Sequence, residues 1–323
     1  MNRSLRKAGA VALLLTPFLL VSSAGAFQTG QANQSAAAAQ TTEKQSREEA
    51  AAKAKLLKSH MAAGNAAMDD ARAIRQQLQT ATGEQKSALT AKMNADYQTA
   101  ITEYQEALKN ARTADGDAIQ PIGLIRLLRN GLISEQKAVE MEVQDKNIPI
   151  ILSNLGMAYS GAGDYDDAIP LLQESMVTEP KPATYMQLGT DLAEVGKLPE
   201  ANAACDKIVI ADPSSAEVKG ACYRNIAVVL MNHGKPSAAV GPLQQTTEIN
   251  ANDAFAWKLL GDALSSGITT QQEQGKVIYL IPPGTLEAYQ KYLQLAPNGP
   301  YASQVKSTLD GFAQLTKGEG KTP

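Results

Sequence analysis

Apolar positions three and four residues apart recur through the second half of the chain, with polar residues between them. Within each stretch, this spacing places the apolar side chains on one face of a helix. One such pattern returns four times over 149–300, at intervals of 33, 38 and 34 residues, with Leu155, Leu188, Ile226 and Leu260 at corresponding positions. Self-similarity at this period is typical of a stack of two-helix units rather than of a globule with one closed core.

Each copy has small and helix-breaking residues where a pair of antiparallel helices needs them. The first copy consists of Leu152, Leu155, Gly156, Tyr159, Gly163, Ala168, Leu172 and Pro180; the second consists of Tyr185, Leu188, Gly189, Leu192, Gly196, Ala201, Cys205 and Pro213. The first Gly lets the second helix approach closely, the next Gly serves the turn, and the proline ends the second helix. This spacing resembles the tetratricopeptide repeat family. The resemblance implies an all-α solenoid of antiparallel helix pairs that binds other proteins.

The repeats predict how the carboxy-terminal part is organised. Residues 149–316 are expected to form four repeats and a closing helix, with an insertion over 265–284 in the last repeat. The insertion carries a β-branched run from Lys276 to Ile281, which can fold back on Ile268 to Thr270 as a small hairpin. Two interpretations remain open: the insertion pads the edge of the solenoid, or it exposes a strand that adds to a partner's sheet.

A long helical hairpin is expected over 46–112, because its second arm is amphipathic and Thr82-Gly83 marks a turn. The stripe of that arm consists of Leu89, Met93, Tyr97, Ala100, Tyr104, Leu108 and Ala111. We interpret the hairpin as a degenerate repeat that caps the solenoid, with a coiled-coil oligomerisation arm as the alternative. Residues 113–148 follow as a helical connector that packs on the first full repeat or, alternatively, lies on a membrane surface.

The first 26 residues predict a secretory signal peptide, with a positive start, an apolar run and the small-residue cleavage site Ala24-Gly25-Ala26. We therefore expect an exported bacterial tetratricopeptide repeat protein, cut after Ala26 and located in the periplasm, with secretion into the medium as the alternative. The mature chain is expected to have no integral membrane span. Residues 27–45 predict a flexible tether and residues 317–323 a disordered tail, because neither has an apolar period.

The resemblance implies a concave groove lined by the first helix of each repeat. The predicted groove residues are Ser153, Met157, Met186, Thr190, Arg224, Asn225, Val228, Met231, Lys258 and Asp262. The three methionines are flexible and suit an adaptable groove, although Met on a helix is also ordinary core filler. Arg224, Asn225 and Lys258 can anchor an acidic group. Chaperone-binding members of the family hold a peptide carboxylate with Lys and Asn, but Ser153 and Met157 stand at the first two of those positions, so that activity is not expected.

Cys205 and Cys222 are the two cysteines of the chain. The resemblance implies that their helices pack together, and an exported compartment permits oxidation. A disulfide between them and two reduced core cysteines both remain open.

Other features argue against catalysis and against a cofactor. His60 and His233 are far apart and lack metal-ligand spacing, and neither cysteine has a convincing base partner. The turn dipeptides Gly196-Lys197 and Gly234-Lys235 lack the glycine framework of a phosphate loop. A formal net charge of −3 argues against nucleic-acid binding. We therefore predict no enzyme, no metal site and no cofactor.

The function predicted from the sequence is a non-catalytic periplasmic adaptor for protein–protein interaction. It would bind a peptide or helix of another protein in the concave groove, within an envelope or secretion assembly. The alternative is a structural scaffold that self-associates through the 46–112 hairpin. The identity of the partner and the oligomeric state are left open.

Overall fold

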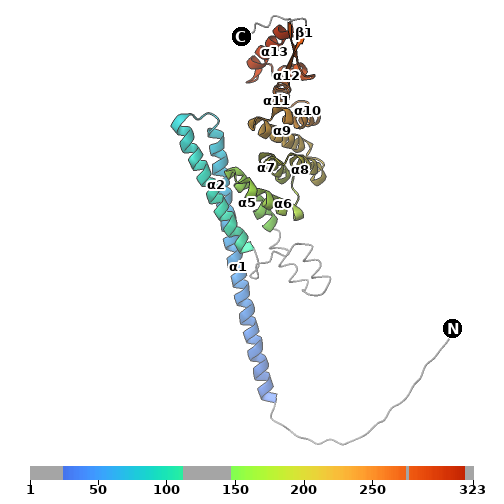
Figure 1. Cartoon of the computed structure of the whole chain (residues 1–323). Coiled ribbons are helices and arrows are strands. Elements are labelled where there is room, and N and C mark those ends of the chain that lie inside the picture. Colours follow the sequence, from blue (N-terminus) through green and yellow to red (C-terminus); the bar gives the residue numbers. More distant parts are fainter. Residues whose placement is uncertain (1–24, 112–146, 274–275, 317–323) are drawn as a thin grey trace, which may run out of the picture. The chain divides into compact units, whose positions relative to one another are not determined.

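The computed structural model describes residues 25–111, 147–273 and 276–316 (Figure 1). The chain divides into two compact units, residues 1–52 and residues 53–323, and each unit is described by itself. Three predicted segments lie wholly or almost wholly outside the described residues: the signal peptide over 1–26, the connector over 113–148 and the tail over 317–323.

The first unit contributes the beginning of helix α1 (Gly25–Gln77). Its residues 27–45 are helical, so the prediction of a flexible tether is wrong. The prediction rested on the missing apolar period, whereas helix formation here follows local propensity. Beyond Gly30 the segment contains no further Gly and no Pro, and it is rich in Ala and Gln, which rank among the better helix formers.

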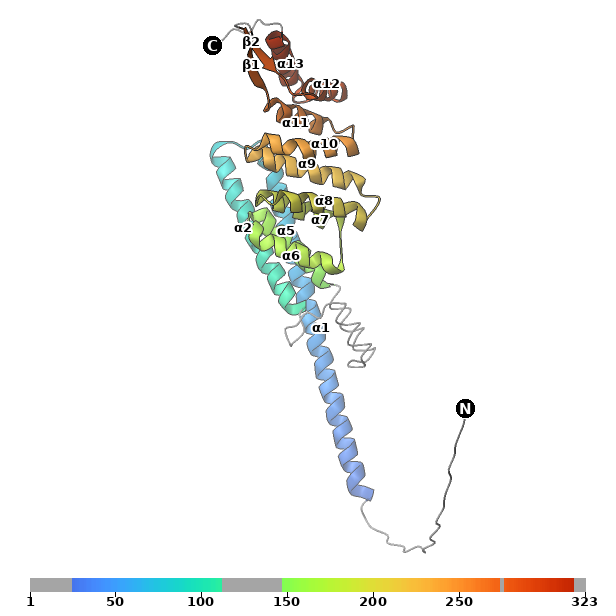
Figure 2. The same cartoon turned by 45° about the vertical axis from the view of Figure 1, so that its right-hand side comes forward.

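The second unit is an array of paired helices, as the fold class predicted. After α1 come α2 (Gly83–Ala111), α5 (Asn147–Ala162), α6 (Tyr165–Thr178), α7 (Pro182–Glu194), α8 (Leu198–Ala211), α9 (Ala216–Asn232), α10 (Pro236–Ile249), α11 (Ala254–Ser265), α12 (Thr285–Leu295) and α13 (Ala302–Thr316). Four antiparallel pairs correspond to the four sequence copies: α5 with α6, α7 with α8, α9 with α10, and α11 with α12 (Figure 2). Helix α13 follows the last pair and packs on α12.

The turns inside the first three pairs depend on glycine. Gly163, Gly196 and Gly234 have φ of 91°, 79° and 67°, a region that other residues rarely adopt. The second helix of the pair begins directly after this turn. In α8 and α10 a proline lies at the first or second position of that helix. The sequence prediction of positive φ at these three positions is confirmed.

The 46–112 hairpin packs its second arm against its first arm and against α5. Tyr97, Ala100 and Tyr104 are almost fully buried, in one cluster with Met68 of α1 and Ile151 of α5. A Cβ at Gly64 would lie 2.7 Å from the Tyr104 ring, so α1 and α2 approach closely there. The apolar stripe of the second arm is therefore used inside the chain.

The insertion in the last repeat forms the small hairpin that the sequence predicted. Strand β1 (Thr269–Glu273) pairs antiparallel with β2 (Lys276–Leu280), in a register that sets Thr269 opposite Leu280. Helix α13 contacts β2. Ile281, directly after the strand, packs on the small core formed by α12 and α13.

Candidate binding surface

The predicted groove residues stand on α5, α7, α9 and α11, the first helices of the four repeats. We call the exposed side of these helices, together with the adjoining part of α1, the first-helix surface. Met157, Met186 and Met231 are half-buried, and each packs on the edge of the main core. Val228 does the same on α9. These four side chains are both partly anchored and partly accessible.

Two predicted groove residues make hydrogen bonds within the chain that limit what they offer a partner. Ser153 is only 8% exposed, and its hydroxyl is 3.0 Å from that of Thr184 on α7. Ser153 is therefore part of the contact between the first two repeats rather than of an open groove. Thr190 is half-buried, and its hydroxyl donates to the carbonyl of Met186, one turn earlier.

The predicted cationic anchors are already paired with carboxylates. Arg224 binds Asp253, whose other carboxylate oxygen caps α11 by accepting from Ala256 N–H at 2.9 Å. Lys258 lies 2.6 Å from Asp262 and 4.7 Å from the centre of the Tyr301 ring. Each cation therefore already has a carboxylate partner in the chain, with which an acidic group of a bound segment would compete, and the anchoring role of Arg224 and Lys258 stays a prediction.

Asn225 and Asp262 are the remaining predicted residues of this surface. Asn225 is half-buried on α9, and no described residue makes a hydrogen bond with its side chain. Asp262 accepts from the hydroxyl of Tyr289 at 2.9 Å as well as pairing with Lys258. Burial of Tyr289 raises the pKa of its hydroxyl above the usual value, and the nearby Asp262 carboxylate adds to the rise.

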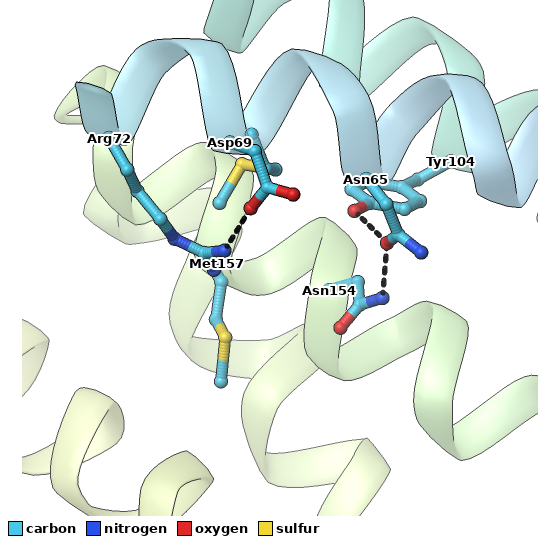
Figure 3. A pocket seen from close by; sticks show the side chains of 7 residues that line it. Asn65, Asp69, Arg72, Tyr104, Asn154 and Met157 are labelled. Carbon is cyan, nitrogen blue, oxygen red and sulfur yellow. Dashed lines mark hydrogen bonds and ion pairs between the residues drawn. The ribbon is translucent and has the colours of Figure 1, made fainter. Parts of the chain in front are cut away.

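The structure brings one predicted groove residue, Met157, into a cavity of about 250 Å³ between α1, α2 and α5 (Figure 3). The cavity is lined by Asn65, Met68, Asp69, Arg72, Tyr104, Asn154 and Met157. We call it the Asn65–Asn154 cavity. Six of these residues were not predicted as site residues, because they lie on the hairpin or one position away from the expected groove pattern.

A hydrogen-bond network centred on Asn65 defines the polar part of this cavity (Figure 3). The side-chain oxygen of Asn65 accepts from the Tyr104 hydroxyl at 2.7 Å and from Asn154 Nδ2 at 3.3 Å. Arg72 Nη1 donates to Asp69 Oδ1 at 2.9 Å, so the two charged residues of the lining neutralise each other. Burial raises the pKa of Tyr104 to about 12, which keeps its hydroxyl protonated as a donor at neutral pH.

A buried carboxylate that the sequence analysis missed lies at the contact between α5 and α7. Asp191 is 0% exposed and accepts from Gln187 Nε2 at 2.8 Å. Its second oxygen contacts the hydroxyl of Ser160, which also donates to the Gly156 carbonyl at 2.9 Å. Burial raises the pKa of Asp191 to about 6, against the opposing effect of these hydrogen bonds.

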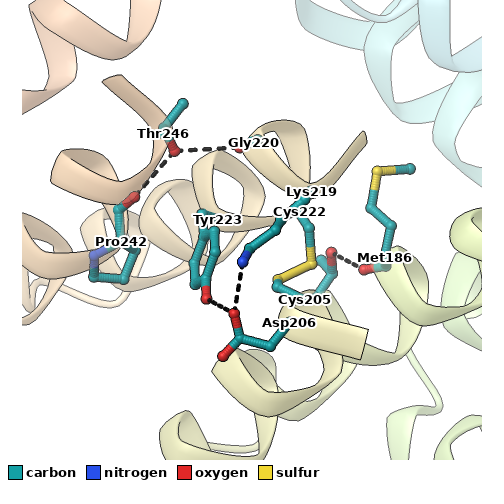
Figure 4. Close-up of a disulfide and its surroundings, with 10 residues drawn as sticks. Met186, Cys205, Asp206, Lys219, Gly220, Cys222, Tyr223, Pro242 and Thr246 are labelled. Carbon is teal, nitrogen blue, oxygen red and sulfur yellow. Dashed lines mark hydrogen bonds and ion pairs between the residues drawn. A yellow bond between two sulfur atoms is a disulfide. The ribbon is translucent and has the colours of Figure 1, made fainter. Parts of the chain in front are cut away.

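Helices α8 and α9 are joined by a disulfide between Cys205 and Cys222 (Figure 4). Both cysteines are 0% exposed, and a Cβ at Gly189 of α7 would lie 3.0 Å from Cys222 Sγ. Close beside the disulfide, Asp206 accepts from Lys219 Nζ at 2.9 Å and from the Tyr223 hydroxyl at 2.8 Å. Burial of Asp206 opposes ionisation, but these two hydrogen bonds outweigh it and lower the pKa of the carboxyl.

Within the part of the chain that the structure describes, no three His, Cys, Asp or Glu side chains gather closely enough to bind a metal ion. The two histidines each contact one glutamate at 2.8 Å, His60 with Glu103 and His233 with Glu194. None of the described helices combines the length and the apolar character that crossing a membrane requires.

The tetratricopeptide repeat family profile matches residues 151–178, which form the pair α5 and α6. Two solved structures of the protein MamA are similar to this chain: one is 22% identical, covering 53% of this chain and 90% of that chain with a TM-score of 0.35. The other is 16% identical, covering 71% and 99% with a TM-score of 0.39. YrrB, described as a TPR protein with an unusual peptide-binding site, is 16% identical, covering 70% and 100% with a TM-score of 0.35. No curated protein matches the sequence. The family profile thus matches one of the antiparallel helix pairs of the array.

Proposed function

We propose that this protein is a non-catalytic adaptor that binds a peptide or a helix of another protein on the first-helix surface. The observation that carries the proposal is the Asn65–Asn154 cavity, which opens beside Met157 and combines flexible apolar walls with hydrogen-bonding groups. Its two methionines can contact the apolar part of a partner's side chain, and its polar groups can orient the end of that side chain. The tetratricopeptide repeat at 151–178 supports the proposal, because proteins with such repeats bind other proteins and peptides.

The half-buried methionines support a surface that adapts to its partner. Met157, Met186 and Met231 occupy three successive first helices and are held at one side by the main core. An unbranched thioether side chain can change rotamer at little cost, so it can repack around different side chains of a bound segment. We expect the bound segment to run across α5, α7 and α9.

We further propose that the protein acts in the periplasm, within an envelope or secretion assembly. This part rests on the sequence of residues 1–26, with its positive start, apolar run and small-residue cleavage site. Amino-terminal sequencing of the protein purified from its native host, combined with osmotic-shock fractionation, tests it. A mature chain beginning at Phe27 in the periplasmic fraction is the expected result, and an uncut chain in the cytoplasm would contradict it.

Cross-linking and co-purification from the native host test the adaptor function. We compare the native chain with a Met157→Glu variant and with a triple variant of Met157, Met186 and Met231 to Glu. The matched control is Ile210→Glu, because Ile210 is 78% exposed on α8, a second helix. Loss of a partner in the methionine variants but not in the control is expected, provided that circular dichroism shows unchanged helix content.

The self-associating scaffold is the competing outcome of the same experiment. The hairpin buries Tyr97, Ala100 and Tyr104 within the chain, which leaves little of its stripe for a second copy. Light scattering after size exclusion is therefore expected to give a monomer. An oligomer that dissociates on replacing Leu56, which is 49% exposed on α1, by Glu would instead favour the scaffold.

A further inference from the structure

The geometry points to a specific occupant of the Asn65–Asn154 cavity: the neutral carboxamide of a Gln or Asn side chain in the bound segment. This inference rests on the proposed function, because the carboxamide belongs to the protein or peptide that the first-helix surface binds. It goes further by naming the chemistry that one position of that partner must have.

The hydrogen-bond inventory of the cavity leaves one donor and one acceptor open. Asn65 Oδ1 is occupied by the Tyr104 hydroxyl and by Asn154 Nδ2. Among the described residues, none accepts from Asn65 Nδ2 and none donates to Asn154 Oδ1. A primary carboxamide carries the complementary pair, a carbonyl oxygen that accepts and an NH₂ group that donates.

The orientation of both asparagine amides is fixed by the network rather than free to reverse. Tyr104 is 1% exposed, and its neutral hydroxyl needs an acceptor, which Asn65 Oδ1 provides. With the Asn65 oxygen turned to Tyr104, the Asn154 side chain must present its NH₂ group to that same oxygen. The open donor on α1 and the open acceptor on α5 are consequences of this one buried hydroxyl.

The charges of the lining favour a neutral occupant over an ion. Arg72 is neutralised by Asp69 within the same helix at 2.9 Å, so the cavity has no net charge. A carboxylate ligand would meet the Asp69 carboxylate and the acceptor oxygen of Asn154, and an ammonium ligand would meet Arg72. A carboxamide meets neither repulsion and does not lose the hydration energy of an ion.

The shape of the cavity favours a side chain over a backbone amide. Its walls come from three helices, and Tyr104 and Met68 are buried at 1% and 5% exposed. A backbone amide has chain on both sides and stays at the mouth, whereas the end of a side chain can enter. Met68 and Met157 then pack on the methylene groups of that side chain.

Capped tripeptides that differ only in the central side chain test the inference. The full chain, labelled with ¹⁵N, is titrated at neutral pH with acetyl-Ala-Gln-Ala-N-methylamide and with the corresponding Glu and Ala peptides, whose N-methylamide cap adds no primary carboxamide. The readout is the side-chain NH₂ signals of Asn65 and Asn154, assigned from Asn65→Asp and Asn154→Asp variants. The Gln peptide is expected to shift both signals until the site is saturated. Its affinity is expected to be about tenfold higher than that of either other peptide.

A charge variant turns the expected preference around. Asp69→Asn leaves Arg72 without its carboxylate, so the Glu peptide is expected to gain about tenfold in affinity while the Gln peptide changes little. The matched control is Asp70→Asn, an exposed neighbour that does not line the cavity, which is expected to leave all three affinities unchanged. Both substitutions are on the helix surface, so neither is expected to unfold the chain.

Each other outcome overturns the inference in a distinct way. Equal shifts with the Gln and Ala peptides would mean that the backbone binds, and tighter binding of the Glu peptide to the native chain would mean an anion site. No shift with any peptide, together with partner capture that depends on the methionines, would remove the carboxamide subsite and leave the adaptor function standing. Shifts with the Gln peptide but no captured partner would contradict the adaptor function and leave the carboxamide subsite standing.

Discussion

The α5–α7 contact between repeats one and two differs in kind from the α7–α9 contact between repeats two and three, although α6 also packs on α7 through the apolar main core. Helix α7 meets α5 at few points, and these include the polar pairs Ser153–Thr184 and Ser160–Asp191. On its other side α7 packs extensively on α9, and this contact lies in the apolar main core. The disulfide links α9 covalently to α8. One repeating pattern thus yields a polar junction between α5 and α7 that can respond to pH, and an apolar junction between α7 and α9 beside which a disulfide links repeats two and three.

The polar junction adjoins the candidate binding surface. Met157 of α5 and Met186 of α7 stand on its two sides, so any change in the contact between these helices alters the distance between two predicted contact residues. The apolar junction, in contrast, lies in the main core, which α6, α8, α10, α11 and α12 share with α7 and α9. We therefore expect the α7–α9 contact to be the more rigid of the two and the α5–α7 contact to be the more adjustable.

The largest expected effect is the loss of a core side chain at the apolar junction. Ile226 is 0% exposed within the main core, so Ile226→Ala is expected to lower the free energy of unfolding by up to about 5 kcal/mol. Urea unfolding followed by circular dichroism measures it. The comparison fails if Ser153→Ala, at the polar junction, costs as much.

Removal of the disulfide is expected to rank second. Cys205 and Cys222 are 17 residues apart, and closing a loop of this length stabilises a protein by about 3 kcal/mol, since the unfolded chain is constrained. The double variant Cys205→Ala, Cys222→Ala is expected to unfold that much more easily and to be insensitive to dithiothreitol. Thiol titration of the denatured, unreduced native protein should detect no free thiol. Two free thiols would show that the cysteines are reduced in the purified protein.

The pH dependence of the free energy of unfolding tests the polar junction separately from the apolar one. Asp191 has a pKa raised to about 6 by burial, against a usual value of 3.8, so the folded state holds the proton more tightly than the unfolded state. The stabilisation that this provides is complete below about pH 4, falls as the pH rises toward 6, and is absent above. Since one pKa unit corresponds to about 1.4 kcal/mol, the total change is at most about 3 kcal/mol.

The matched variant for this prediction is Asp191→Asn. The charged and titratable neighbours are Glu194 on α7, which binds His233 of α9, and Tyr165 on α6, and these groups remain in the variant. The difference in unfolding free energy between native chain and variant therefore reports Asp191 alone. A difference that stays constant from pH 4 to pH 8 would show that Asp191 does not titrate in this range.

The repeats and their turns could be predicted from the sequence, because they depend on the local spacing of apolar and glycine residues. Gly163, Gly196 and Gly234 could be assigned to turns with positive φ from their place between two apolar stripes, and the structure confirms them. The β1–β2 hairpin could be predicted for the same reason, from a β-branched run beside a polar turn. Residues 27–45 were predicted wrongly, because helix propensity there outweighs the missing apolar period.

Contacts between repeats could not be predicted from one sequence. Ser160 and Asp191 are 31 residues apart, and their contact depends on how far α7 is shifted along α5. The pairing of Arg224 with Asp253 depends in the same way on the register of α9 and α11. Asn65 was missed because the 46–112 hairpin was interpreted as a cap, although the network with Tyr104 and Asn154 makes it part of the candidate site.

The smallest expected effect concerns the second polar pair of the same junction, Ser153 with Thr184. Ser153→Ala and Thr184→Val each leave one buried hydroxyl without its partner and are expected to cost about 1 kcal/mol. The double variant removes both hydroxyls, so its cost should be well below the sum of the two single costs, with a coupling of about 1 kcal/mol. Urea unfolding of the four proteins measures this cycle. Strict additivity would mean that the two hydroxyls do not depend on each other. In that case Ser160 and Asp191 would be the pair that sets the junction, and its response to pH would be its main difference from the disulfide-linked one.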